Sequence, residues 1–233
     1  MNPAMARWQR HDTREALAEA LAWRLAAAAD TGTRRHGRAC LALAGGGTPL
    51  PAYRSWAAQA VPGEAVSLLP TDERWVPDTD PASNLAQLRA CFGPGPRWLP
   101  LVPAAAGAEP TAATATASLA QVAGDFDAVL LGMGDDGHFA SLFPGDPGLA
   151  AALDPHSPAD AVVVRPDPLP ANAPYPRVSL TLARLLRTRV LLLAATGTPK
   201  HELLEAAAAG ATRWPVSALL AAAGDALEIH WSP

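Results

Sequence analysis

The chain has 233 residues, of which 49% are hydrophobic and 17% charged, and its net charge is −4. This length and apolar content suffice for one sizeable core, and an acidic balance without a basic tract argues against nucleic-acid binding. No run approaches the roughly 18 apolar residues of a membrane span and the N-terminus lacks the apolar core of a signal peptide, so we expect a cytoplasmic protein without a membrane partner.

The first half of the chain alternates helical and strand patterns. In chain order it predicts a helix at 11–32, a strand at 39–44, a Gly-rich turn entering a helix at 45–60, a strand at 65–73, a helix at 80–92, a loop at 93–110, a helix at 111–123 and a strand at 127–134. Asp12 is the expected cap of the first helix, with Glu15 as the acid of a capping box, and Gly32 is its expected end. Asp80 is expected to cap the helix that follows it.

The second half continues the alternation. It predicts a Pro-rich loop at 144–176 with a short strand at 161–166, a strand-to-helix step from 177, a buried strand at 189–195, helices at 198–210 and 215–224, and a last strand at 226–231. Buried strands alternating with helices indicate βαβ units and a mostly parallel sheet. No linker divides the chain, so we expect an α/β fold with a single domain over residues 1–233. Its two cysteines, Cys40 and Cys91, stand far apart and near no histidine pair, which favours reduced core thiols.

In parallel α/β sheets, ligands collect beyond the carboxyl ends of the strands. Four loops leave predicted strands there with unusual content: "GGGTP" at 45–49, "TDERWVP" at 71–77, "GMGDDGHFASLFPG" at 132–145 and "GTPK" at 197–200. In "GGGTP", Thr48 is expected to cap the following helix with Pro49 in its first position. The three glycines leave backbone N–H groups bare at a helix N-terminus, which favours an anion. A tight turn that needs positive φ is the alternative.

The third of these loops carries the strongest candidate for a catalytic group. "GMGDDG" matches the dinucleotide-binding pattern, but it lies in mid-chain, and Asp135 and Asp136 would point negative charge at a pyrophosphate. His138 follows, and Asp136 can orient its imidazole, which favours a catalytic base over a structural histidine. In "TDER", Asp72 and Arg74 stand at a strand end, where a solvated charge cluster is equally consistent. No loop has metal-ligand spacing.

Lys200 is the only lysine; the other basic side chains are arginine. It lies in the first turn of a predicted helix, where a cation opposes the helix dipole unless an anion binds there. A compact ammonium fits a narrow turn where a planar guanidinium does not, so we predict a phosphate contact, with a chance exposed lysine as the alternative. Together the four loops indicate a phosphorylated small substrate and hydrolytic or proton-transfer chemistry without a cofactor.

Five stretches, "GGGTP", "DERWVPDTDPASN", "GMGDDGHFASLFPG", "RVSLT" and "GTPK", stand across residues 45–200 in an order and spacing that resemble the 6-phosphogluconolactonase family, which is similar to the glucosamine-6-phosphate deaminases. The resemblance implies a modified Rossmann-like fold with helices flanking the sheet. It also implies hydrolysis of 6-phospho-D-glucono-1,5-lactone to 6-phosphogluconate, the second step of the oxidative pentose phosphate pathway. The sequence leaves open whether the protein is a monomer or a small homo-oligomer.

By the family pattern, His138 would activate water, with Asp136 beside it as the second catalytic residue. Arg74 and Lys200 would hold the phosphate together with the turn formed by Gly45, Gly46, Gly47 and Thr48. Asp72 and Arg177 are further candidates for substrate binding, and Arg177 or loop N–H groups could stabilise the oxyanion.

Two positions separate the related activities. The deaminases carry an acidic residue five positions past the histidine, where this chain has Phe143, and they typically lack the arginine seen at Arg74; both differences favour the lactonase. Phe139 departs from the lactonase pattern, in which a threonine is usual. The alternatives are a glucosamine-6-phosphate deaminase/isomerase and a catalytically silent sugar-phosphate sensor, which should lack the base or carry a DNA-binding segment.

Overall fold

A seven-stranded sheet forms the centre of the computed structural model, which describes residues 6–60, 62–165 and 174–233. Every pair of neighbouring strands in this sheet is parallel, which confirms the predicted sheet type. The first five residues, and residues 166–173 of the predicted loop at 144–176, lie outside the described part of the chain. In spatial order the strands are β1 (Arg7–Arg10), β10 (Leu227–Ser232), β9 (Leu191–Thr196), β6 (Ala128–Gly132), β2 (Ala39–Leu43), β3 (Val66–Pro70) and β5 (Arg97–Trp98).

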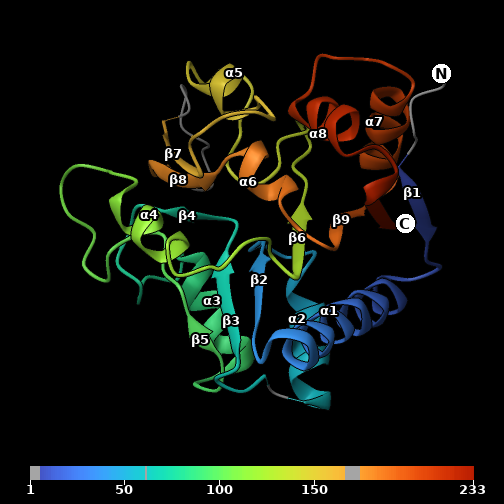
Figure 1. Ribbon diagram of the computed structural model, residues 1–233. Coiled ribbons are helices and arrows are strands. Elements are labelled where there is room, and N and C mark those ends of the chain that lie inside the picture. Colours follow the sequence, from blue (N-terminus) through green and yellow to red (C-terminus); the bar gives the residue numbers. More distant parts are fainter. Residues whose placement is uncertain (1–5, 61, 166–173) are drawn as a thin grey trace.

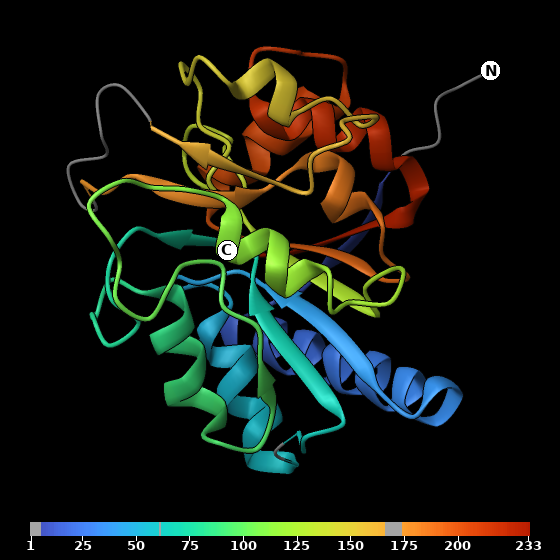
Figure 2. The ribbon, with the colours of Figure 1, turned by 60° about the vertical axis from the view of Figure 1, so that its left-hand side comes forward.

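Helices cover both faces of this sheet, because side chains alternate in direction along each strand. The bounds are α1 (Arg14–His36), α2 (Leu50–Gln59), α3 (Asn84–Phe92), α4 (Ala113–Leu119), α5 (Leu149–Ala152), α6 (Leu182–Leu186), α7 (Thr198–Ala208) and α8 (Pro215–Ala223). Leu41 and Leu130 pack in one core with α1, α2 and α3, whereas Ala42 and Leu131 pack in the other with α4, α6, α7 and α8. Figure 2 shows α1–α3 and α7–α8 in separate parts of the molecule.

A second, smaller sheet lies beyond the carboxyl ends of β2 and β3 (Figure 1). Its strands are β4 (Asp72–Arg74), β8 (Arg177–Leu180) and β7 (Ala161–Val164), and both pairs are antiparallel. Only Thr71 separates β4 from the end of β3, so the chain passes directly from the large sheet into the small one. The predicted strand at 65–73 is therefore two strands, and the second one faces the region where ligands are expected.

The predicted caps of α1 and α3 are wrong. Thr13, not Asp12, caps α1, and its hydroxyl accepts a hydrogen bond from the N–H of Ala16 at 3.1 Å. In the same way Ser83, not Asp80, caps α3. Aspartate and threonine are both good caps, so the choice depends on which residue has extended backbone next to the first helical turn.

Helix α1 also runs past Gly32, its predicted end, to His36. Gly37 ends it instead, in the left-handed conformation with φ 71°. Gly32 lies buried inside the helix, where a Cβ atom would stand only 2.6 Å from the Asp127 carboxylate. This glycine is therefore explained by close packing against the start of β6.

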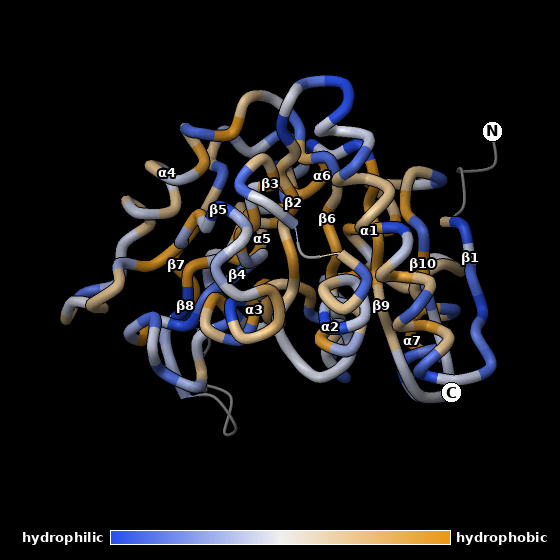
Figure 3. Tube along the Cα trace, turned by 90° about the horizontal axis from the view of Figure 1, so that it is seen from below, coloured by the Kyte–Doolittle hydropathy of each residue, from blue (hydrophilic) through white to orange (hydrophobic). Residues whose placement is uncertain are grey.

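Two strands and a short helix have no counterpart among the predicted elements. β1 precedes the first predicted helix, whereas β5 and α5 lie in segments predicted as loops. β1 is hydrophilic along its length, whereas the central strands are hydrophobic (Figure 3). Within the described residues, no helix combines the length and the apolar character that crossing a membrane requires.

Candidate active site

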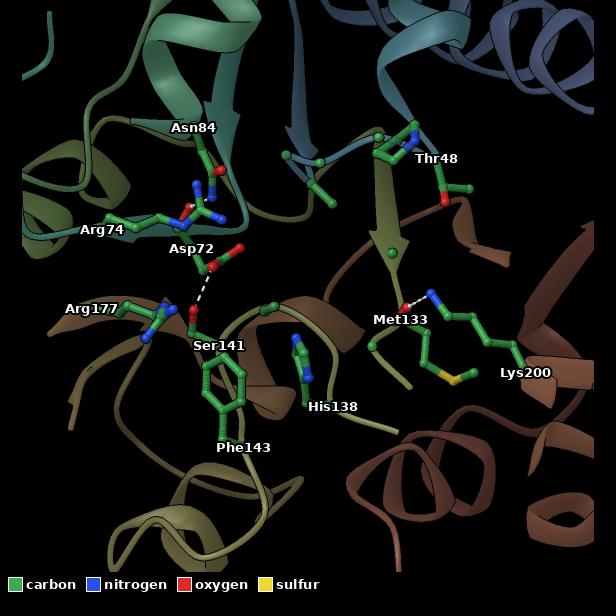
Figure 4. Close-up of a pocket in the computed structure, with 18 residues that line it drawn as sticks. Thr48, Asp72, Arg74, Asn84, Met133, His138, Ser141, Phe143, Arg177 and Lys200 are labelled. Atoms are coloured by element: carbon green, nitrogen blue, oxygen red, sulfur yellow. Dashed lines mark hydrogen bonds between the residues drawn. The ribbon is translucent and has the colours of Figure 1, made fainter. Parts of the chain in front are cut away.

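A cavity of about 310 Å³ opens beyond the carboxyl ends of β2 and β6, beside the small sheet (Figure 4). Every predicted site residue except Asp136 lines it, and Asp136 bonds to a lining residue. The lining residues are Ala44, Gly45, Gly46, Gly47, Thr48, Pro49, Asp72, Arg74, Asn84, Gly132, Met133, Gly134, His138, Ala140, Ser141, Phe143, Arg177 and Lys200. Segments far apart in the sequence therefore meet where the parallel-sheet rule predicts.

The "GGGTP" turn forms one wall of the cavity between β2 and α2. Gly46 has φ 95°, a conformation that disfavours residues with a Cβ, and a Cβ at Gly45 would overlap the Asn84 carboxamide. The predicted cap is wrong here: α2 begins at Leu50, and Thr48 makes no capping bond. Thr48 instead lines the cavity, at a helix N-terminus whose dipole favours an anion.

The loop after β6 folds into a tight turn that presents His138. The N–H of Gly134 donates to the carbonyl of His138 at 2.9 Å, and Gly137 has φ 76°. A Cβ at Gly134 would overlap the imidazole ring. Gly134 and Gly137 of "GMGDDG" are thus explained by the turn that presents His138, without a dinucleotide.

Asp136 holds the imidazole of His138 by one ring nitrogen. His138 Nδ1 lies 2.5 Å from Asp136 Oδ1, and the same oxygen accepts the His138 N–H at 3.1 Å. Partial burial raises the pKa of the Asp136 carboxyl, but the hydrogen bonds and the charge of His138 outweigh it, so the pKa lies below its ordinary value. No hydrogen bond within the described chain engages Nε2 of His138. An imidazole oriented by a carboxylate at Nδ1 and open at Nε2 has the arrangement of a general base.

Two arginines face the cavity from the small sheet. Arg74 and Arg177 are directly opposite partners in the β4–β8 pair, so their side chains project from the same face. Arg74 donates to the carbonyl of Ala82 at 2.6 Å, and its buried Nε finds no hydrogen-bond partner among the described residues. Arg177 is 3% exposed and donates to the carbonyl of Tyr175 at 2.9 Å. Burial lowers the pKa of Arg177, and the Asp72 carboxylate opposes that shift.

Lys200 reaches the cavity from the first turn of α7. Its ammonium donates to the carbonyl of Met133 at 2.6 Å and lies 3.5 Å from the exposed carboxylate of Asp135. In Figure 4, Lys200 and Thr48 lie towards one end of the cavity, Arg74 and Arg177 towards the other, and His138 between them. The cavity thus carries three cations in a chain whose net charge is −4, which fits an anionic ligand.

The carboxylates of the "TDER" motif are buried, so the alternative of a solvated charge cluster is wrong for them. Glu73 points away from the cavity and accepts hydrogen bonds from Ser83 Oγ and from the N–H groups of Asn84 and Leu85 at 2.7–2.9 Å. Burial raises the pKa of the Glu73 carboxyl, and these bonds oppose the rise. Glu73 therefore anchors the start of α3.

Three lining residues that are not among the predicted site residues contact them. Asn84 Nδ2 donates to the backbone carbonyl of Asp72 at 2.7 Å, and the Ser141 hydroxyl donates to the Asp72 carboxylate. The ring of Phe143 lies 4.2 Å from that of His138, and the guanidinium carbon of Arg177 lies 4.8 Å from the Phe143 ring centroid. All three residues belong to the motifs named above, but nothing in their local sequence shows which strand they contact.

Neither a metal cluster nor a disulfide accompanies the site. Among the described residues, no group of three or more His, Cys, Asp or Glu side chains could hold a metal ion. Cys40 and Cys91 form no disulfide, and both are partly buried. Burial raises the pKa of Cys40 to about 12, so this thiol stays protonated and unreactive at neutral pH.

Comparisons with known proteins agree over nearly the whole chain. The family model of glucosamine-6-phosphate isomerases/6-phosphogluconolactonase matches residues 12–231. The chain is 35% identical to a 6-phosphogluconolactonase of Mesorhizobium japonicum, over 100% of this chain and 98% of that protein. It is 39% identical to a 6-phosphogluconolactonase of Caulobacter vibrioides, over 94% of each. A crystal structure of a 6-phosphogluconolactonase from Shewanella baltica matches with a TM-score of 0.87 and 29% identity, over 98% of both chains.

Proposed function

The chain belongs to the family of glucosamine-6-phosphate isomerases and 6-phosphogluconolactonases, and on this premise we propose that it hydrolyses 6-phospho-D-glucono-1,5-lactone to 6-phospho-D-gluconate. The observation that carries the proposal is one oriented imidazole, His138, set among three cations around a single cavity. This arrangement suits an anionic ester that is attacked by water. The reaction is the lactone-opening step of the oxidative pentose phosphate pathway.

In the proposed mechanism, Nε2 of His138 accepts a proton from water as the water oxygen attacks the lactone carbonyl carbon. Asp136 keeps the imidazole in the required tautomer and stabilises its protonated form. The tetrahedral intermediate carries an oxyanion, for which Arg177 or loop N–H groups are the candidate donors. As that intermediate collapses, the bond to the ring oxygen breaks, and the ring oxygen takes the proton back from the imidazolium. The net reaction consumes one water and needs no cofactor.

The phosphate is best placed at the Lys200 end of the cavity. There the ammonium and the N-terminus of α2, whose dipole is positive at that end, both favour a dianion. The family pattern implies that Arg74 also binds the phosphate together with Lys200, and that role of Arg74 stays a prediction. The buried Nε of Arg74 would gain a partner from any substrate oxygen at its end of the cavity.

The deaminase alternative is less well supported by the residue beside the base. At position 143 the phenyl ring of Phe143 packs on His138, so this side chain can supply no carboxylate for acid–base work. The sensor alternative is disfavoured because the base and its orienting carboxylate are both in place. A phosphorylated lactone is charged and stays inside a cell, which supports a cytoplasmic location. Whether the enzyme is a monomer or a small homo-oligomer stays open.

A direct assay tests the function. The purified protein is expected to consume 6-phosphogluconolactone well above the rate of its spontaneous hydrolysis, followed by acid release at constant pH. Ammonia release from glucosamine 6-phosphate, measured on the same preparation, is the control. Comparable efficiency on glucosamine 6-phosphate would replace the lactonase by the deaminase, and binding without turnover of either compound would favour the sensor.

A further inference from the structure

The segment that follows His138 contains an unusual backbone conformation. Ala140 has φ 48°, and it is the one non-glycine residue at positive φ in the described part of the chain. This conformation is disfavoured for alanine because Cβ approaches the following carbonyl oxygen. Ala140 lies in the cavity wall, two residues after the proposed base. Something in the surrounding structure must therefore hold it there.

Ser141, the next residue, connects this segment to the small sheet. It is fully buried, its N–H donates to Ser179 Oγ at 3.2 Å, and its hydroxyl donates to Asp72 Oδ2. The other carboxylate oxygen of Asp72 accepts from the Thr71 hydroxyl at 3.2 Å. Asp72 is itself buried, and a hydrogen bond to a buried carboxylate is stronger than one between neutral groups, so the bond from Ser141 is a firm tie.

Both partners of Ser141 belong to the small sheet that carries the arginines. Asp72 lies opposite Ser179 in the β4–β8 pair, and Arg74 lies opposite Arg177 two residues further along. The four side chains therefore share one face of that sheet. Ser141 is the residue through which the loop of the base is bonded to this face. Figure 4 shows Asp72 and Ser141 joined between Arg177 and His138.

We propose that Ser141 is a positioning residue for the hydrolysis: its bonds to Asp72 and Ser179 hold Ala140 in the left-handed conformation and so fix His138 relative to Arg74 and Arg177. The inference rests on the proposed function, because it assigns a role in that reaction. If the link breaks, Ala140 can relax to negative φ and the loop shifts. The base then moves relative to the substrate that the cations hold.

The test begins with Ser141→Ala. A displacement of about 1 Å at the base corresponds to a loss of up to roughly 100-fold in kcat, so we expect a fall of about 10- to 100-fold. KM should change much less, because the cations remain. Ser118→Ala is the matched control: Ser118 is also a buried serine, and it donates to the carbonyl of Pro100 at 2.6 Å, away from the cavity. It should lower the melting temperature without lowering kcat.

The decisive measurement combines Ser141→Ala with Ala140→Gly. Glycine adopts positive φ without a steric cost, so the double variant should regain part of the kcat that Ser141→Ala alone loses. Regained kcat supports the proposal, since a role in global stability gives no reason for such a rescue. An unchanged kcat in folded Ser141→Ala, or a double variant no faster than it, overturns the proposal.

Two further measurements keep the test decisive. If Ser141→Ala does not fold, Ser141→Cys keeps the side chain's shape with a much weaker donor, and the same comparison with Ala140→Gly applies. A crystal structure of the variant should show residue 140 at negative φ with a shifted imidazole; an unmoved loop overturns the proposal. If the wild-type protein itself fails to hydrolyse the lactone, the proposed function fails instead, and the crystal structure still reports on the loop.

Discussion

Replacing Lys200 by alanine should weaken binding of the phosphorylated lactone with little effect on its turnover. The ammonium has three N–H groups, of which one donates to the carbonyl of Met133. The Asp135 carboxylate at 3.5 Å is exposed, so solvent screens its attraction for the ammonium. Two N–H groups and most of the charge are therefore free for a phosphate. A charge-assisted hydrogen bond contributes about 1.5–3 kcal/mol, which corresponds to a rise in KM of about 10- to 150-fold.

Three variants separate the possible roles of this side chain. Lys200→Met keeps the apolar stem and should lose as much affinity as Lys200→Ala, because the charge is what binds. Lys200→Arg should recover only part of the affinity, because the planar guanidinium is wider than an ammonium in a turn lined by backbone groups. The assay compares KM and kcat on 6-phosphogluconolactone with those on unphosphorylated gluconolactone, for which none of the three variants should differ from wild type.

The structure also offers a second role that would explain a loss of activity in the Lys200 variants. Met133, to which Lys200 donates, directly precedes the turn that presents His138, so Lys200 could act by holding that turn. In that case kcat would fall on both lactones and KM would change little. An equal loss on the phosphorylated and unphosphorylated lactones would refute the assignment of Lys200 to the phosphate. The same comparison with Arg74→Ala decides whether Arg74 belongs to the phosphate or to the other end of the cavity.

Three further predictions concern the base, metal dependence and stability. His138→Asn should lower kcat by roughly 10²–10⁴ in a protein that melts like wild type, and a near-normal kcat would remove His138 from its role. Activity should survive EDTA, because the described residues gather no three metal-ligating side chains; loss on chelation with recovery on Zn²⁺ or Mg²⁺ would contradict this. Burial, with help from His11, lowers the pKa of His230 to about 4, so below about pH 6.5 the unfolded chain takes up a proton that the folded one does not. The free energy of unfolding measured in urea should therefore fall by about 2 kcal/mol from pH 7 to pH 5, and an equal fall in His230→Gln would contradict this origin.

The parts of the fold that could be predicted are those with a strong local pattern. β2, β6 and β9 are continuous apolar runs, because parallel strands are buried on both faces, and the predicted family and sheet type are confirmed. β1 reads Arg-Trp-Gln-Arg and lies at the edge of the sheet, so it has no apolar pattern to find. β5 has two residues between prolines and glycines, and its pairing with β3 depends on the fold around it.

For the site, too, some features could be predicted from the sequence and others could not. The residues with chemistry of their own, among them His138, Asp136 and Lys200, could be selected because they follow predicted strands at one edge of the sheet. The contacts of Ser141 with Asp72 and Ser179 could not, because they join the loop after β6 to two paired strands, β4 and β8, that lie far from it and from each other in the chain. Such pairing is a property of the three-dimensional arrangement, and no single stretch of sequence encodes it.

The position of β1 has a consequence for the order in which the protein folds during synthesis. Among the described residues, β1 pairs in this sheet with β10 alone, so Arg7 stays unpaired until Glu228 has been made, and β9 likewise keeps one open edge until then. A ribosome adds about 5–20 residues per second, so the first strand stays unpaired for at least roughly ten seconds. During that time, α1 and β2 can pack locally, whereas the outer half of the sheet stays exposed to chaperones and proteases. The arginines at both ends of β1 reduce its tendency to pair with other nascent chains.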